Sequence, residues 1–242
     1  MNKNPIIIAL DVETAREASE TIGELRQSGC AFKIGLQLFC AVGASFVRET
    51  VDSGVRIFLD LKFHDIPNTV AKASIEAARM RVWMFNVHAS GGGEMMKTTA
   101  EQVREVCDKE NLIVPHIIAV TVLTSSNQET LRETGIESSV ETQVVKLAEL
   151  TAKCGLGGVV ASPLEVRLIR ENVEAENFLI VTPGVRPNFA TNDDQKRVTT
   201  AGEAVAGGSD YLVIGRPILN APDKNSAMRK ILEEIAFYKK DF

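Results

Sequence analysis

The stretch VRIFLDLKFHDIPNT, residues 55–69, decides how the rest of the chain is interpreted. Its opening run of β-branched and aromatic residues predicts a buried strand. Side chains alternate between the two faces of a strand, so Asp60 and Lys62 are expected on one face. The proline of this stretch cannot extend the strand, and Thr69 is predicted to be the N-cap of a helix over Val70–Met80. The stretch therefore predicts a strand that ends in charged residues and leads into a helix.

The same alternation of an apolar strand with a helix recurs along the whole chain. Strands are predicted at Ile6–Leu10, Ala31–Ile34, Val55–Leu59, Val82–Val87, within Leu112–Val122, and at Gly157–Val160, Phe178–Thr182 and Tyr211–Ile214. Eight such repeats in 242 residues predict a (β/α)8 TIM barrel of the α/β class, with residues 1–242 forming a single domain. A doubly wound open sheet, which is also built from parallel strands, is the alternative.

Polar side chains follow the predicted strands at the points where the strands end. They are Asp11, Lys33, Asp60 with Lys62, His88, Thr124, Arg186 and Arg216. A barrel gathers the carboxyl ends of its strands on one face, where enzymes of this fold build their sites, whereas an open sheet spreads several of them apart. This placement favours the closed barrel and predicts a polar site at its mouth.

Composition and charge exclude several classes of function. The net charge is −5 and 24% of residues are charged, which argues against a general role on nucleic acid or on membrane surfaces. Four scattered cysteines without a C-x-x-C pair argue against a disulfide framework or a structural zinc site. The first apolar run is too short for a signal peptide or a membrane span, so a cytoplasmic protein is expected.

The charged residues near the third strand have two interpretations. As an isolated D-x-K-x-x-D pattern, Asp60, Lys62 and Asp65 could form structural ion pairs, because short motifs often match by chance. Together with Lys33 they give two lysines and two carboxylates, a balanced row of charges whose burial is tolerable. The first interpretation needs only a strand end, and the second predicts a cluster of charges that can be buried together.

The ten residues DLKFHDIPNT at 60–69 closely resemble the signature of the bacterial type of the orotidine 5′-phosphate decarboxylase family. Four other segments carry the same resemblance. They are Ala9-Leu10-Asp11, FKIG at 32–35, TPGVRP at 182–187 and IGRP at 214–217, with DDQKR at 193–197 between the last two. The resemblance spans Ile6–Pro217, which is nearly the whole chain.

The resemblance implies a cofactor-independent decarboxylation of orotidine 5′-monophosphate to UMP, with no metal. Lys62 would give its proton to C6 of the pyrimidine as CO2 leaves, and its ammonium would stabilise the developing carbanion. Asp60 would lie where the substrate carboxylate must sit, and their repulsion would be relieved as CO2 departs. Lys33 and Asp65 would complete the catalytic set.

The resemblance also implies a set of binding residues and a homodimer. Asp11 and Lys33 would hold the ribose hydroxyls, and Thr124 would contact the edge of the pyrimidine. Gln195 would bridge base and phosphate, and the loop at 188–197 would close over the ligand. The phosphate would be bound by Arg186, Gly215 and Arg216. Asp65 and Thr69 would reach the ribose in the neighbouring subunit, which places the sites at a dimer interface.

Two rival functions remain open at this stage. Related barrels that share D-x-K-x-x-D, such as keto-gulonate phosphate decarboxylases and hexulose phosphate synthases, need Mg²⁺, but their signature does not read HDIPNT. A catalytically silent phosphate-binding barrel is the rival from another class. His88 is expected to be a satisfied strand-end histidine, and Gly91-Gly92-Gly93 a tight turn rather than a phosphate cradle, because the lysine of a P-loop is missing.

Overall fold

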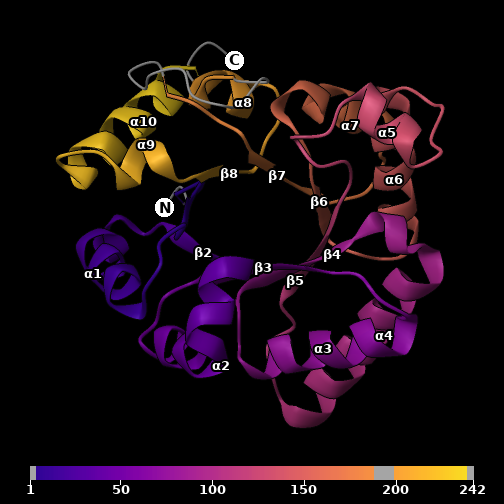
Figure 1. The fold of residues 1–242 in the computed structure, drawn as a ribbon, viewed down its shortest axis with the longest axis horizontal. Coiled ribbons are helices and arrows are strands. Elements are labelled where there is room, and N and C mark those ends of the chain that lie inside the picture. The colour runs from indigo at the N-terminus through magenta and orange to yellow at the C-terminus, as the bar shows by residue number, and fades with distance from the viewer. Residues whose placement is uncertain (1–3, 188–198, 239–242) are drawn as a thin grey trace.

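The computed structural model describes residues 4–187 and 199–238 and contains a closed barrel of eight parallel strands (Figure 1). Each strand pairs with the next one along the chain, and the last pairs with the first. The strands are β1 Ile6–Ala9, β2 Ala31–Gly35, β3 Ile57–Phe63, β4 Met84–His88, β5 His116–Val120, β6 Gly158–Val160, β7 Leu179–Pro183 and β8 Tyr211–Ile214. The prediction of a closed barrel is confirmed, and the open sheet is excluded.

Helices surround the barrel and cover its outer face (Figure 1). The α-helices are α1 Ala15–Leu25, α2 Leu36–Asp52, α3 Pro67–Arg79, α4 Gly93–Glu110, α5 Gln128–Glu133, α6 Val140–Lys153, α7 Val166–Asn172, α8 Ala201–Ala206, α9 Arg216–Leu219 and α10 Lys224–Tyr238. Short 3-10 turns are η1 Arg26–Ser28, η2 Ala89–Gly91 and η3 Pro163–Glu165. In the described part of the chain, no helix is long and apolar enough to cross a membrane.

The strands are apolar on both faces because each face packs against a separate core. The larger core lies between strands and helices and includes Ile8, Phe32 and Leu59. A smaller core fills the inside of the barrel. It contains Ile7, Ala9, Ala31, Phe58, Met84, Ile118, Val181 and Val213. Parallel strands buried in this way read as continuous hydrophobic runs, which is why the sequence predicted them so clearly.

The start of α3 differs from its prediction. The predicted N-cap at Thr69 is wrong, because α3 already begins at Pro67 and its N-cap is Ile66, with no side-chain cap. Proline suits the first turn of a helix, where its missing N–H would have no partner and its fixed φ angle is already helical. Thr69 therefore lies inside the first turn, and its side chain is exposed.

Two short helices and one break were not predicted. Helix α5 has six residues and α9 has four, too few for a helical period to show in the sequence. Helix α2 is interrupted at Gly43, whose φ of 71° is a conformation that glycine adopts at no steric cost. The predicted tight turn before α4 is present, with Gly92 at a φ of 89°.

Candidate active site

The end of β3 is distorted so that Lys62 leaves the regular ladder. The pairing with β4 passes from Leu59–Phe85 to Phe63–Val87, so β3 advances four residues while β4 advances two. Lys62 takes up part of this excess with a φ of 51°, in the left-handed region that side chains rarely adopt. The bulge therefore redirects the lysine side chain at the mouth of the barrel.

Ion pairs join the ends of the first three strands. Lys62 Nζ lies 2.7 Å from Asp60 Oδ1, and Lys33 Nζ lies 3.4 Å from Asp60 Oδ2 and 3.3 Å from Asp11 Oδ1. The Lys33 and Asp60 side chains are each only 11% exposed. Two lysines and two carboxylates compensate one another, which makes this burial tolerable. The predicted pairing of Asp60 with Lys62 is confirmed.

The contacts around Asp60 keep its carboxyl group ionised. Burial alone would raise the pKa of Asp60. The charges of Lys33 and Lys62 act in the opposite direction, and so do hydrogen bonds from Lys62 and Asn86. These contacts outweigh burial, so the pKa of Asp60 lies below its ordinary value. The site therefore holds a buried, ionised carboxylate 2.7 Å from Lys62 Nζ.

Asn86 belongs to this cluster, although it was not predicted from the sequence. It is completely buried in β4. Its side-chain amide donates to Asp60 Oδ1 at 2.7 Å, and its carbonyl oxygen accepts the backbone N–H of Lys62 at 2.8 Å. A buried amide needs such partners. An asparagine within the apolar run of β4 was the available signal.

Two glycines make room for the charged side chains. A Cβ atom on Gly35 would lie 3.0 Å from Lys33 Nζ, and one on Gly215 would lie 3.2 Å from Asp11 Oδ2. Both distances are tighter than ordinary contacts, so a side chain at either position would push on the row of charges. Steric crowding by Lys33 thus explains why glycine suits position 35, at the end of the FKIG segment. The absence of a side chain at Gly215 lets the end of β8 approach Asp11.

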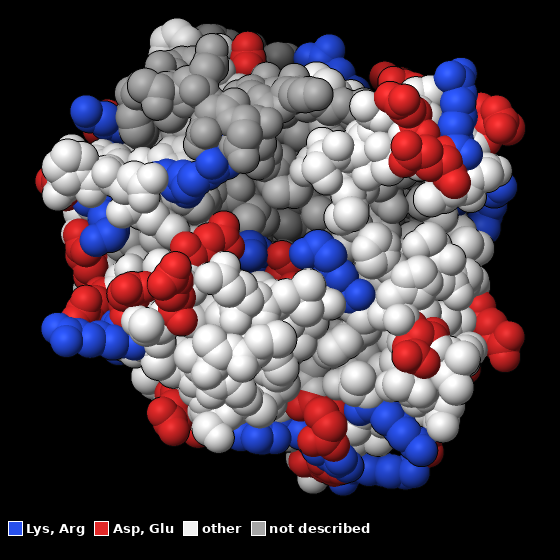
Figure 2. All heavy atoms as spheres, in the orientation of Figure 1, with Lys and Arg blue, Asp and Glu red and all other residues white. Residues whose placement is uncertain are grey.

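A cavity of about 170 Å³ opens beside these charges at the mouth of the barrel. One side carries Lys33, Asp60 and Lys62, and Thr124 also lines the cavity. The other side is apolar and is formed by Val120, Val122, Leu123, Val160, Pro183 and Val213. Figure 2 shows a hollow near the middle of this face, with acidic and basic side chains alternating over β2 and β3 and uncharged side chains to its right.

The predicted phosphate residues lie at the ends of the last two strands. Arg186 follows β7, and its backbone N–H donates to Thr199 O at 3.0 Å. Gly215 is the N-cap of α9, and Arg216 is the first residue of that helix. β7 and β8 are neighbours in the barrel, so both arginines, which are half-buried, belong to the same side of the mouth. Gln195 and the loop at 188–197 lie outside the described residues.

Asp65 and Thr69 are not brought into the cavity of their own chain. Both side chains are exposed, and neither lines the cavity. Asp65 Oδ1 accepts the backbone N–H of Ile66 at 2.7 Å, and among the described residues it forms no ion pair. Asp11, rather than Asp65, stands at the end of the row of charges within one chain.

Comparisons with known proteins identify the family. A model of the "Orotidine 5'-phosphate decarboxylase / HUMPS family" matches residues 4–231. The chain belongs to this family. It is 53% identical over 234 residues to the orotidine 5′-phosphate decarboxylase of Syntrophotalea carbinolica, covering 97% of this chain and 96% of the relative. The Geobacter sulfurreducens protein of the same name is also 53% identical over 234 residues, covering 96% of each chain.

A solved structure gives the same result for the fold. The crystal structure of the orotidine 5′-phosphate decarboxylase from Lactobacillus acidophilus superposes with a TM-score of 0.84 at 34% identity. The superposition covers 96% of this chain and 99% of that one. The resemblance first seen at residues 60–69 is therefore confirmed over nearly the full length.

His88 lies behind the charged side of the mouth. Its ring is 5.5 Å from the ring of His64, and within the described ranges its buried Nδ1 has no hydrogen-bond partner. Burial lowers the pKa of His88, and the neighbouring His64 and Lys62 lower it further. His88 is therefore neutral at pH 7 and does not line the cavity. The prediction that its hydrogen bonds are satisfied is wrong for Nδ1.

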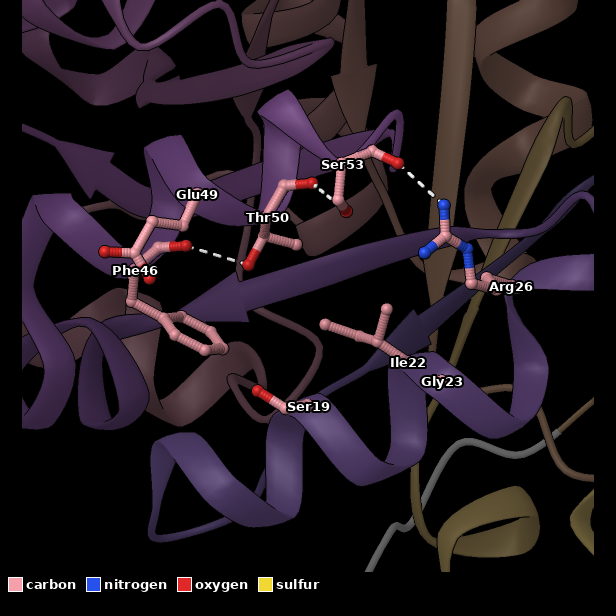
Figure 3. A pocket seen from close by; sticks show the side chains of 8 residues that line it. All are labelled: Ser19, Ile22, Gly23, Arg26, Phe46, Glu49, Thr50 and Ser53. Carbon is pink, nitrogen blue, oxygen red and sulfur yellow. Dashed lines mark hydrogen bonds between the residues drawn. The ribbon is translucent and has the colours of Figure 1, made fainter.

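Another hollow, of about 230 Å³, lies between α1 and α2 and has different chemistry (Figure 3). Its polar side chains are engaged in hydrogen bonds to backbone carbonyl oxygens at or near the end of α2. Arg26 donates to Ser53 O at 2.6 Å, Ser53 Oγ donates to Thr50 O at 2.7 Å, and Thr50 Oγ1 donates to Phe46 O at 2.8 Å. The volume of the cavity does not identify the mouth of the barrel as the candidate active site, but the buried opposite charges there do.

Among residues 4–187 and 199–238, no three His, Cys, Asp or Glu side chains gather in an arrangement that could hold a metal ion.

Proposed function

We propose that this chain decarboxylates orotidine 5′-monophosphate to UMP, the last step of UMP synthesis. The observation that carries the proposal is Lys62 Nζ, held 2.7 Å from the buried Asp60 carboxylate at the edge of a cavity with an apolar opposite wall. The names of the 53% identical relatives support the same reaction. The test is a steady-state assay of the purified protein with this substrate, following the loss of pyrimidine absorbance. Absence of turnover would overturn the proposal.

In the proposed reaction, Lys62 is the proton donor. The bond between C6 and the carboxylate carbon breaks, and its electron pair remains on C6 as CO2 leaves. Lys62 Nζ gives a proton to C6, which forms the C–H bond of UMP, and the neutral amine then takes a proton from solvent. A carbanion at C6 is strongly basic, so an ammonium group fixed beside it stabilises the developing charge.

Asp60 and Lys33 prepare the site for this step. The Asp60 carboxylate is buried and ionised, so a substrate carboxylate placed next to it is repelled until CO2 departs. Lys33 Nζ lies between Asp60 and Asp11, which fixes both carboxylates. The apolar wall suits the flat pyrimidine and the uncharged CO2, and it strengthens the charges opposite by excluding water.

We propose that the remaining residues bind the substrate as the resemblance implies. Asp11 and Lys33 hold the ribose, and Thr124, which lines the cavity, contacts the base. Arg186, Gly215 and Arg216 bind the phosphate, which is supported by their position after β7 and β8 and by the common use of these strand ends for phosphate in barrels. Gln195 keeps its proposed role between base and phosphate.

The proposed reaction needs no cofactor, and this has a separate test. The developing charge is met by Lys62, so the protein itself supplies the electrostatic stabilisation that Mg²⁺ supplies in the rival barrels. Turnover should be unchanged after dialysis against excess chelator and should not rise when Mg²⁺ is added. Loss of activity with chelator, restored by the metal, would instead favour the metal-dependent rivals. A cytoplasmic location remains a prediction.

We further propose a homodimer in which Asp65 and Thr69 serve the partner's site. Their exposure beside the mouth supports this, because neither lines its own cavity. Large apolar side chains are exposed at the same end of the barrel. Ile66 is 67% exposed, Leu36 56% and Leu123 42%, and covering them would favour association.

Mixing two inactive variants tests this arrangement. Lys62→Ala and Asp65→Asn are each expected to be nearly inactive as homodimers. If Asp65 acts on the partner's site, each mixed dimer has one site with both lesions and one with neither. Random exchange then leaves roughly a quarter of all sites intact. The two variants are unfolded and refolded together, and their activity is compared with each refolded alone. No recovery, with mixed dimers verified by mass spectrometry, would exclude sharing across the interface.

A further inference from the structure

Asn86 touches two parts of the proposed catalytic pair at once. Its side-chain carbonyl accepts the backbone N–H of Lys62, and its side-chain N–H donates to the carboxylate of Asp60. The residue is completely buried in β4, on the strand next to the one that carries the pair. An asparagine in an apolar strand costs free energy unless both ends of its amide are used, and here both are.

The contact to Lys62 holds an unfavourable piece of backbone. Lys62 adopts a φ of 51° within the bulge, where the strand pairing is interrupted. Its N–H is thereby withdrawn from the regular ladder, and the Asn86 carbonyl oxygen supplies the acceptor at 2.8 Å. Backbone held in such a region persists only where its surroundings fix it. Asn86 is one of the groups that fix the direction in which the lysine side chain leaves the strand.

The contact to Asp60 sets the orientation of the carboxylate. Oδ1 receives two donors, Asn86 Nδ2 and Lys62 Nζ, each at 2.7 Å, while Oδ2 faces Lys33 Nζ at 3.4 Å. Because the amide of Asn86 is neutral, it fixes the carboxylate without adding charge to the balanced cluster. A third cation at this position would compete with Lys62 for the same oxygen.

We propose that Asn86 is a positioning residue for the decarboxylation, acting through the orientation of Asp60 and the backbone of Lys62. The inference rests on the proposed function for its kinetic consequence but not for its structural one. If it is right, loss of the side-chain amide lowers kcat while product binding remains, because the groups that bind the nucleotide are left in place.

The first variant is Asn86→Ala, with Val103→Ala as its control for stability. Val103 is completely buried in α4 and is not among the residues that line the cavity. We expect Asn86→Ala to lower kcat about 100-fold, the scale for a misplacement of about 1 Å, with the Kd for UMP changed less than about threefold. Val103→Ala should lower the melting temperature without lowering kcat. If the two variants lose kcat only in proportion to the loss of folded protein, Asn86 is merely structural.

The second variant, Asn86→Asp, separates the two contacts. An oxygen remains to accept the Lys62 N–H, but the donor to Asp60 is replaced by a second carboxylate. Two carboxylates in contact share a proton, which raises the pKa of the pair. The nearby charges of Lys33, Lys62 and Asp11 also influence that pKa. His88, which lies on β4 like Asn86, and His64 beside it are further titratable groups near the pair.

Activity of Asn86→Asp should therefore rise relative to wild type as the pH falls, since the shared proton restores a donor between the two groups. Asn86→Ala should show no such rise at any pH. A profile for Asn86→Asp with the shape of the wild-type profile would overturn the proposal. An Asn86→Ala variant with wild-type kcat would do the same.

A measurement that needs no substrate tests the positioning role of Asn86 independently of the proposed function. NMR of protein with ¹³C-labelled aspartate follows the Asp60 carboxyl without substrate. Removing the Asn86 donor should raise the pKa of Asp60 above its wild-type value. If the wild-type protein does not act on orotidine 5′-monophosphate but this change is seen, the function fails and the positioning stands. An unchanged Asp60 titration overturns the positioning whatever the activity.

Discussion

The two halves of the barrel mouth differ in how their side chains are stabilised. In the half formed by β1 to β4, Asp11, Lys33, Asp60 and Lys62 are stable only as a connected set, each held by an opposite charge. In the half formed by β5 to β8, the cavity wall consists of apolar side chains such as Val120, Val160 and Val213, which need no partner. The charged half offers groups that can take part in a reaction, and the apolar wall limits the access of water to them.

The difference has a physical consequence for single substitutions. Removing one member of the charged half leaves another charge uncompensated, so effects there are large and extend along the row. Trimming an apolar side chain of the cavity wall removes only contact area, so effects there are small and local, whereas Arg186 and Arg216 at the ends of β7 and β8 are expected to act through the phosphate. The predictions below test this contrast.

The largest effect is expected for Lys62→Ala. With the proposed proton donor and its charge both lost, kcat should fall by at least about 10⁴-fold. Calorimetry should still detect UMP binding, because the phosphate and ribose contacts remain. Lys97→Ala is a suitable control, since Lys97 is 68% exposed on α4 and should keep wild-type activity. Near-normal turnover of Lys62→Ala would rule out the mechanism.

Arg216→Ala should have the next largest effect and should depend on the substrate. Loss of a charged phosphate contact is expected to cost about 2–4 kcal/mol of transition-state binding, measured as kcat/KM. Activity on orotidine, which lacks the phosphate, should be almost unchanged by the same substitution. An equal loss on both substrates would mean that the arginine acts structurally or elsewhere.

The third prediction concerns how the free energy of unfolding depends on pH through Asp60. The pKa of Asp60 in the folded protein lies below its ordinary value of 3.8, so its ionised form stabilises the native state. This contribution is fully present above the unfolded value and is lost as the pH falls through the lower, folded value. The free energy of unfolding of Asp60→Asn should therefore depend less steeply on pH below 3.8 than that of wild type. Chemical denaturation at a series of pH values measures the two slopes, and equal slopes would contradict the assigned shift.

The smallest effect is expected in the apolar half. Val160→Ala removes two methyl groups from the cavity wall and should change kcat/KM by about tenfold, the low end of the range for a methylene-sized change in a pocket. The pH profile should keep its wild-type shape, because no charged group is touched. A loss as large as that of Lys62→Ala would show that the two halves are not distinct in the way described here.

The sequence predicted the strands well because each strand depends on local chemistry. Continuous apolar runs indicated buried parallel strands, and regular alternation predicted only that Asp60 and Lys62 share a face. The bulge that makes their contact possible could not be predicted, because it arises from the pairing of β3 with β4. Asn86 was missed for a related reason. Its partners come from another strand, and a single amide in an apolar run does not say which.

The helix starting near Thr69 shows a different kind of error. A threonine is a good N-cap in general, but Pro67 already fits the first turn, so the helix begins earlier. The pairing of Lys33 with Asp11 and the approach of Gly215 to Asp11 join segments far apart in the chain. The pairing of β1 with β2 creates the first contact, and closure of the barrel, which brings β8 beside β1, creates the second.

The row of alternating charges has a consequence for repeated turnover. Before the reaction the row carries two ammonium groups and two carboxylates. In the proposed reaction Lys62 gives up its proton, and two carboxylates would then face one ammonium, with one surplus negative charge in the row. That surplus would attract a proton back to the member that has just lost one. Under the proposed mechanism, the arrangement that compensates the charges would thus also recharge the donor before the next substrate binds.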